Sequence, residues 1–135
     1  MQKITRIVLI DDDKDLCALL EMELESTGRF QIKSSTRSET ALALIKTERP
    51  DLAILDINMP EMHGVELATL LAQDPLTAGI PILYLTGMVS PEEVNRIGGG
   101  HTLRTLISKQ SPRTELIAAI DNLLNLSPAK ESRLA

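Results

Sequence analysis

The stretch Asp51-Leu-Ala-Ile-Leu-Asp-Ile-Asn-Met-Pro60 decides the fold that we expect for this chain. Four apolar residues, Leu52 to Leu55, follow one another without a polar break and end at Asp56. A short continuous apolar run of this kind is typical of a strand in a parallel sheet that is covered on both faces. The stretch therefore predicts a strand that carries an aspartate at its carboxyl end.

Similar short apolar runs on both sides of this stretch alternate with longer segments of helical period. Such alternation indicates repeated strand–helix units around a parallel sheet, which is an α/β fold. The other strands are expected at Ile7–Ile10, at a partly exposed edge around Phe30 and Ile32, at Ile80–Leu85 and, with a weaker pattern, at Leu103–Ser108.

Five helices are expected between and after these strands, and each has a start or stop signal of the usual kind. The signals are apolar positions from Leu16 to Leu24 with a stop at Gly28, a cap at Ser38 with an end before Pro50, the run Val65–Gln73 after Gly64, a capping box at Ser90–Glu93, and Ser111-Pro112 before an apolar face that includes Leu116 and Ile120.

The bulk composition fits one globular domain, which we place at residues 1–126, followed by a polar tail or linker start at 127–135. The formal net charge of −5, the absence of extended Lys/Arg clusters, and the presence of only one Phe, one Tyr and no Trp argue against direct nucleic-acid binding. No apolar run approaches the ~20 residues of a membrane span. The lone Cys17 lies among apolar helical positions, which favours a buried thiol, a reducing compartment and a cytoplasmic protein.

Polar and charged residues follow four of the expected strands at the point where each strand ends. Asp11 to Asp13 follow the first strand, Asp56 ends the third, Thr86 follows the fourth and Lys109 follows the fifth. The carboxyl ends of parallel strands meet at one edge of a sheet, so we expect these side chains to lie close together. Carboxylates held close repel one another and favour a divalent cation, and an oxygen-only donor set suits Mg²⁺ or Mn²⁺ rather than Zn²⁺.

The same set of residues suits phosphoryl transfer. The Asp56 carboxylate is placed to attack phosphorus as a nucleophile, while the Thr86 hydroxyl and the Lys109 ammonium neutralise phosphoryl oxygens. The alternative is that the aspartates are structural, since Asp caps helices. For Asp13 and Asp15 in particular, stabilisation of the first helix stays an open alternative. The joint occurrence of these residues at the correct strand ends favours the functional interpretation.

At this point the chain resembles the receiver domains of two-component response regulators, over about residues 4–126. The resemblance implies an α/β fold with a doubly wound, five-stranded parallel sheet in the order 2-1-3-4-5, flavodoxin-like, with helices on both faces. The matching pieces are Ile7-Val-Leu-Ile-Asp-Asp-Asp13, Asp51–Pro60 with Gly64 after it, Ile80-Pro-Ile-Leu-Tyr-Leu-Thr-Gly87, and Lys109.

The resemblance also implies roles and partners. A phosphorylated histidine on a histidine kinase or phosphotransfer protein is the expected donor, and an unidentified downstream protein is the expected target. The domain promotes its own phosphorylation and dephosphorylation without being a classical turnover enzyme. The roles are direct metal binding by Asp12 and partly water-mediated binding by Asp11, phosphate acceptance and metal binding by Asp56, a backbone carbonyl ligand from Asn58 whose side chain influences dephosphorylation, a switch hydroxyl on Thr86, and the conserved-type lysine at Lys109.

Three departures from the family pattern concern the switch rather than the chemistry. Gln110 follows Lys109 where most members have Pro, often after a cis bond. A cis bond before a non-proline residue costs ~2.5–4 kcal/mol, so we expect a trans bond and a different support for Lys109. Leu106 stands where an aromatic residue usually rotates on activation. Gly98–Arg104 replaces an acidic loop next to the expected output face of the fourth helix, fifth strand and fifth helix, where a weak homodimer is one expectation.

Two other functions compete with the active receiver. A degenerate receiver that serves as a phosphorylation-independent docking or dimerisation module is motivated by Gln110 and Leu106. A phosphatase with an aspartyl nucleophile after the first strand is disfavoured, because such enzymes resemble Asp-x-Asp-x-Thr/Val there. Asp11-Asp-Asp-Lys-Asp15 ends in Asp instead, and the chain offers no cap domain.

Overall fold

Five parallel strands form one sheet in the order β2-β1-β3-β4-β5. The structure is a computed structural model that describes residues 3–57, 59, 64–87 and 105–125. The predicted doubly wound parallel sheet and its strand order are confirmed. The strands are β1 Thr5–Ile10, β2 Phe30–Ser35, β3 Leu52–Asp56, β4 Ile82–Thr86 and β5 Thr105–Ser108.

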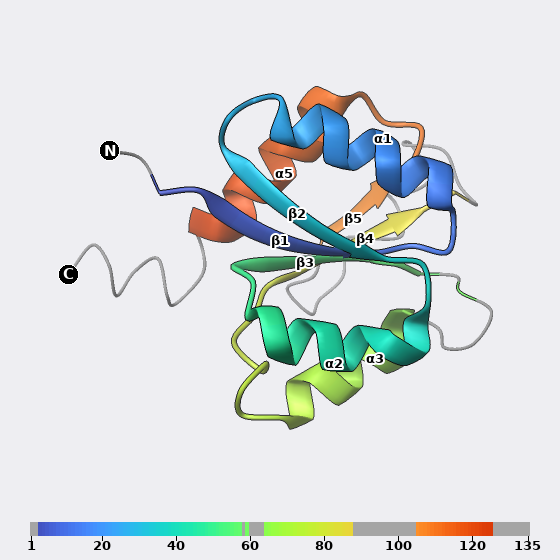
Figure 1. The fold of residues 1–135 in the computed structure, drawn as a ribbon, viewed down its shortest axis with the longest axis vertical. Helices are drawn as coiled ribbons and strands as arrows, with labels where there is room; N and C mark the ends of the chain where they lie inside the picture. The colour runs from blue at the N-terminus through green and yellow to red at the C-terminus, as the bar shows by residue number, and fades with distance from the viewer. Residues whose placement is uncertain (1–2, 58, 60–63, 88–104, 126–135) are drawn as a thin grey trace.

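Helices cover both faces of this sheet. Figure 1 shows α1 and α5 together on one face and α2 and α3 on the other. The helix expected from Ser90 and the insertion Gly98–Arg104 lie outside the described residues, as does the tail after residue 125. The four helices described are α1 Lys14–Glu25, α2 Ser38–Glu48, α3 Gly64–Gln73 and α5 Arg113–Asn125.

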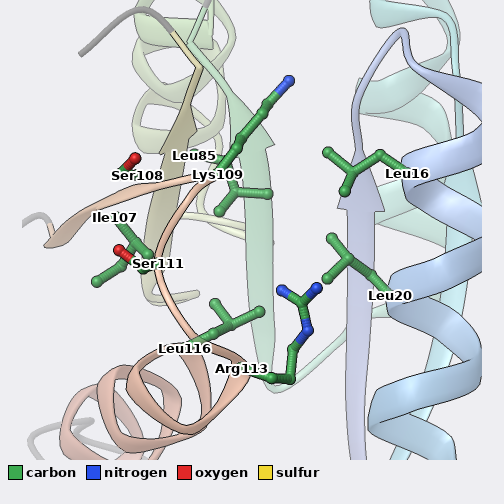
Figure 2. A pocket seen from close by; sticks show the side chains of 9 residues that line it. All are labelled: Leu16, Leu20, Leu85, Ile107, Ser108, Lys109, Ser111, Arg113 and Leu116. Carbon is green, nitrogen blue, oxygen red and sulfur yellow. The ribbon is translucent and has the colours of Figure 1, made fainter. Parts of the chain in front are cut away.

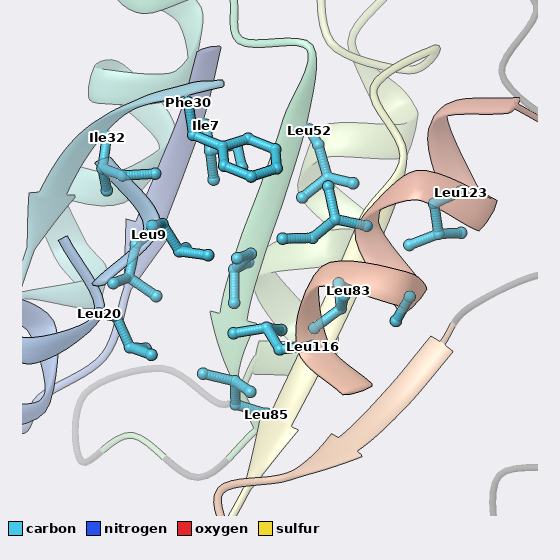
Figure 3. Packing of buried hydrophobic residues seen from close by; sticks show 14 of the residues in the cluster. Ile7, Leu9, Leu20, Phe30, Ile32, Leu52, Leu83, Leu85, Leu116 and Leu123 are labelled. Carbon is cyan, nitrogen blue, oxygen red and sulfur yellow. The ribbon is translucent and has the colours of Figure 1, made fainter. Parts of the chain in front are cut away.

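The alternation of side chains along each strand creates two cores, one on each side of the sheet. In β1, Ile7 and Leu9 enter the core that α1 and α5 cover, while Val8 and Ile10 enter the core on the side of α2 and α3. Strand β3 repeats the pattern, with alternate residues of Leu52–Leu55 in the two cores. Neither face is left to solvent, and this explains why the central strands are apolar without interruption. Figure 3 shows the first of these cores, which is aliphatic apart from Phe30 and Cys17.

The start of α2 differs from the prediction. Ser38 was expected to cap this helix, but it is the first helical residue and is buried, and Arg37 precedes it without a capping side chain. The hydroxyl of Ser35 instead accepts a hydrogen bond from the Arg37 N–H at 3.1 Å and bonds to the Thr40 hydroxyl at 3.0 Å. These hydroxyl groups hold the chain as it enters the helix, so α2 begins one residue earlier than expected.

Other boundaries follow the predicted signals closely. Asp13 caps α1 by accepting a hydrogen bond from the Leu16 N–H at 3.1 Å. Gly28 takes a φ of +78° after that helix, a conformation that glycine adopts without strain. Strand β4 begins at Ile82 rather than Ile80, because the Ile80 N–H is donated to the Thr77 carbonyl in the preceding turn.

We expect Leu24→Ala to lower the free energy of unfolding by about 2–5 kcal/mol, because the Leu24 side chain is fully buried in the core beneath α1. Leu19→Ala is the matched control on the same helix. Leu19 is 43% exposed, so its truncation should change stability by no more than about 1 kcal/mol. Urea unfolding of both variants measures the difference, and similar losses for the two would contradict the placement of α1 on the sheet.

Candidate functional site

The polar residues expected at the strand ends meet at the carboxyl edge of the sheet. Asp56 is the last residue of β3 and lies opposite Leu85 in the register, and Thr86 ends β4 opposite Ser108. Hydrogen bonding continues past the strands, from Ile57 N–H to the Leu85 carbonyl at 3.0 Å and from Lys109 N–H to the Thr86 carbonyl at 2.7 Å. The strand tips are therefore held in register where the functional side chains begin.

Three carboxylates form an acidic cluster at this edge. Asp11, Asp12 and Asp56 each offer an oxygen, and these oxygens all lie within 4.8 Å of one another. Asp11 and Asp56 are buried, and Asp12 is exposed. An all-oxygen set with one side open to solvent fits a divalent cation of the Mg²⁺ or Mn²⁺ class. Asn58, the fourth predicted ligand, lies outside the described residues.

Asp13 stands apart from this cluster. Its carboxylate caps α1, and its backbone N–H is donated to Asp11 Oδ1 at 2.9 Å. The structure therefore favours the structural alternative for Asp13, which stabilises the helix and helps to orient Asp11. Asp15 lies in the first turn of α1, where a negative charge complements the helix dipole.

Lys109 provides the positive charge of the site. Its ammonium Nζ lies 2.8 Å from Asp11 Oδ2 and 3.3 Å from Asp56 Oδ2. Burial lowers the pKa of Lys109, but the hydrogen bonds and charges of Asp11 and Asp56 outweigh this effect, so the pKa lies above its usual value and the lysine stays charged. Figure 2 shows the lysine side chain extending toward the strand ends, away from Arg113 and Leu116.

The backbone around Lys109 has the expected trans geometry, since the described residues contain no cis peptide bond. The ammonium nevertheless reaches both carboxylates without the family's proline. Gly87 lies beside the stem of the lysine, where a Cβ atom would be 3.4 Å from Lys109 Cδ. Because Gly87 has no side chain, the aliphatic part of Lys109 can lie close to the backbone at the end of β4.

A small pocket lies beneath Lys109, between α1, α5 and the ends of β4 and β5. Its walls include Leu16, Leu20 and Leu116, and Lys109 lines its upper side (Figure 2). The volume of about 10 Å³ holds no more than one water molecule. This pocket is a packing gap rather than a place for a small-molecule substrate.

Cys17 supports the site from the side of α1. The buried thiol donates a hydrogen bond to the Asp11 carbonyl, with Sγ and O 3.3 Å apart. Burial, reinforced by the negative charge of Asp11, raises the pKa of Cys17 to about 11, so the thiol is protonated at neutral pH. This is the inert, buried cysteine that the sequence predicts.

Comparison with known proteins decides the family. The family model described as the response regulator receiver domain matches residues 7–121. This chain belongs to the response regulator receiver family. Receiver domains are signalling domains that interact with histidine kinases and phosphotransfer proteins.

Individual relatives agree with this assignment. The phosphate regulon transcriptional regulatory protein PhoB of Pseudomonas aeruginosa is 33% identical over 119 residues, covering 87% of this chain and 51% of PhoB. A response regulator of Desulfuromonas acetoxidans has a TM-score of 0.74 at 27% identity, covering 90% of this chain and 98% of that one. The BeF3-activated receiver domain of Klebsiella pneumoniae RstA has a TM-score of 0.71 at 28% identity, covering 88% and 97% of the two chains.

The curated relatives are longer proteins, and this chain spans about half of their length or less. None of the helices in the described residues has the length and apolar character needed to cross a bilayer. At the family's aromatic position, Leu106 lies in β5 opposite Tyr84 and packs against the core on the side of α2 and α3. An aliphatic residue therefore occupies the place of the usual rotating ring.

We expect Lys109→Met to lower the free energy of unfolding of the metal-free protein by about 2–5 kcal/mol, because it leaves Asp11 and Asp56 buried without a cation. Lys46→Met is the control. Lys46 pairs with Asp74 at 2.8 Å on the surface, where solvent screens an ion pair and its contribution to stability is small. Denaturant unfolding in the presence of a chelator compares the two, and equal effects would show that Lys109 does not balance the buried charges.

Proposed function

We propose that this receiver domain accepts a phosphoryl group onto Asp56 from a phosphohistidine of a histidine kinase or phosphotransfer protein, in a Mg²⁺-dependent reaction. The observation that carries this proposal is the buried Asp56 carboxylate, which clusters with the carboxylates of Asp11 and Asp12 and lies 3.3 Å from the ammonium of Lys109. A relative whose receiver domain is described as BeF3-activated supports the same chemistry. The domain modifies itself and does not turn over a substrate.

The residues of the chain divide the chemical work. An oxygen of Asp56 forms the bond to phosphorus, while the bond between phosphorus and the histidine nitrogen breaks and the electron pair leaves with the imidazole. That carboxylate is buried at the tip of β3, and its Oδ2 lies 3.3 Å from the Lys109 ammonium. In this proposal the Lys109 ammonium and the Thr86 hydroxyl neutralise the phosphoryl oxygens.

The acidic cluster supports the proposed metal requirement. Asp11, Asp12 and Asp56, with the backbone carbonyl of Asn58, are the proposed ligands of the cation, and Mn²⁺ suits the same donors. A bound Mg²⁺ would neutralise charge on the phosphoryl group during transfer. The same cation would offset the negative charge that Asp11 and Asp12 place next to Asp56.

Phosphorylation replaces the Asp56 carboxylate by a larger dianionic group, so Lys109 and Thr86 must redistribute their contacts. Thr86 and Lys109 are joined by a backbone hydrogen bond across β4 and β5, and we propose that this pair of strands transmits the change to a partner protein. Residues 1–126 act as the receiver domain and 127–135 as a tail or linker. We propose that the protein carries out this function in the cytoplasm.

The test is incubation of the full chain with acetyl phosphate and Mg²⁺, followed by prompt measurement of intact mass. We expect one added phosphoryl group, which Asp56→Asn and the omission of Mg²⁺ both abolish. Asp15→Asn is the matched control, because Asp15 is an exposed aspartate of α1 outside the cluster, and this variant should be labelled like the wild type.

The degenerate-receiver alternative makes the opposite prediction. If the protein gains no phosphoryl group and also fails to bind beryllofluoride in the presence of Mg²⁺, Asp56 is not a phosphoacceptor. The domain would then act by docking alone. Labelling that persists in Asp56→Asn would place the chemistry on another residue.

Metal binding is testable without any phosphoryl donor. We expect Mg²⁺ to raise the melting temperature in a concentration-dependent manner, because a cation that binds only the folded state stabilises it by mass action. Asp12→Asn should weaken the apparent Mg²⁺ affinity by roughly tenfold or more, since it removes a proposed ligand while leaving the buried pair Asp11 and Asp56 intact. A melting temperature that Mg²⁺ does not change in the wild type would contradict a metal site.

A further inference from the structure

The turn that carries Lys109 is held by three consecutive backbone N–H groups. Lys109 N–H is donated to the Thr86 carbonyl at 2.7 Å, and Ser111 N–H is donated to the Ser108 carbonyl at 3.0 Å. Between them, Gln110 N–H is donated to the hydroxyl oxygen of Ser108 at 3.1 Å. The chain therefore makes a hydrogen-bonded turn immediately after β5, with the lysine as its second residue.

Ser108 is the residue on which this turn closes. Its carbonyl and its hydroxyl oxygen each accept one of the turn's N–H groups, and it is 2% exposed, so its side chain is fixed by its surroundings. It lies opposite Thr86 in the β4–β5 register. The sequence patterns that identified the site gave Ser108 no role.

The Ser108–Gln110 hydrogen bond depends on the departure from the family pattern. A proline at position 110 would have no N–H to donate, so the bond requires a residue other than proline there. A proline restricts a turn covalently, whereas this turn is restricted by a side chain that binds the backbone two residues later. The two arrangements are different means of holding the same lysine.

We propose that Ser108 is a positioning residue for Lys109, and that its hydroxyl replaces the family's proline in aiming the ammonium at Asp11 and Asp56. This inference rests on the proposed function of Lys109 in phosphoryl transfer. The ammonium meets two carboxylates at 2.8 and 3.3 Å from the end of a four-carbon side chain. A small rotation of the turn at its base moves the ammonium away from both carboxylates, so the turn sets how well the charge is placed.

Because of where Gln110 lies, the effect of the Ser108 hydroxyl on Lys109 can be tested without a large change in the stability of the protein. Gln110 is exposed, so its N–H can bind water when the Ser108 hydroxyl is removed. Ser108→Ala is close to isosteric and keeps the backbone bonds of the turn. The variant should therefore fold with nearly the wild-type melting temperature and should loosen the turn that carries Lys109.

The first arm of the test uses nuclear magnetic resonance on the metal-free full chain. We expect the Gln110 amide and the Lys109 ammonium protons to exchange slowly with solvent in the wild type and faster in Ser108→Ala. Ser108→Thr retains the hydroxyl and should restore slow exchange. Ser111→Ala is the matched control, since the Ser111 hydroxyl belongs to the same turn and makes no hydrogen bond within the part of the chain that the structure describes.

The second arm measures the rate of phosphorylation by acetyl phosphate. Ser108→Ala should react about fivefold more slowly, which corresponds to the loss of one hydrogen bond between neutral groups. Ser108→Thr and Ser111→Ala should react at the wild-type rate.

Either of two results overturns the inference. Ser108→Ala with wild-type ammonium exchange and a wild-type rate would show that the hydroxyl does not aim Lys109, although phosphorylation of the wild type would leave the proposed function intact. Ser108→Thr that is as slow as Ser108→Ala, at a normal melting temperature, would show that packing rather than the hydroxyl matters. If the wild type takes no phosphoryl group, the proposed function is wrong. The exchange measurements then still test, on their own, whether Ser108 positions Lys109.

Discussion

The placement of two buried carboxylates beside one another is the constraint on which the rest of this structure depends. Asp11 and Asp56 lie at the tips of adjacent strands, where water cannot separate their charges, and like charges in such surroundings repel strongly. Lys109 enters from a third strand end and contacts both. A positive charge at this edge therefore stabilises the fold, and a distant part of the chain supplies it through Lys109.

The double core explains how that edge stays in order. Central strands that are buried on both faces have little freedom to shift, so their tips keep a fixed register. Around the carboxylates, short-range contacts add direction: the Asp13 backbone and the Cys17 thiol both bond to Asp11, and the Ser108 turn carries the lysine. Rigid strands set the positions of the charged groups, and neighbouring polar groups set their orientation.

Much of this arrangement could be predicted from the sequence, because continuous apolar runs identify the strands and a parallel sheet brings their carboxyl ends together. Asp11, Asp56, Thr86 and Lys109 follow from that rule alone. Where several similar polar side chains lie near one backbone group, the sequence does not predict which of them forms the hydrogen bond. Three hydroxyl residues, Ser35, Ser38 and Thr40, compete to hold the start of α2, and the sequence does not say which of them faces the backbone. The same holds for Ser108, whose role depends on the direction of one hydroxyl, and for Leu19, whose helical spacing does not reveal that it is 43% exposed.

The buried thiol makes local opening of the fold measurable by chemical labelling. Cys17 is the lone cysteine of the chain, and it is both covered by protein and protonated at neutral pH, so alkylating reagents cannot reach it or react with it in the closed state. The speed at which such a reagent labels the chain therefore reports how often α1 lifts from the sheet. The Cys17 thiol also donates a hydrogen bond to the Asp11 carbonyl, so each of those openings disturbs the acidic edge. The labelling rate therefore also reports how often the site itself opens.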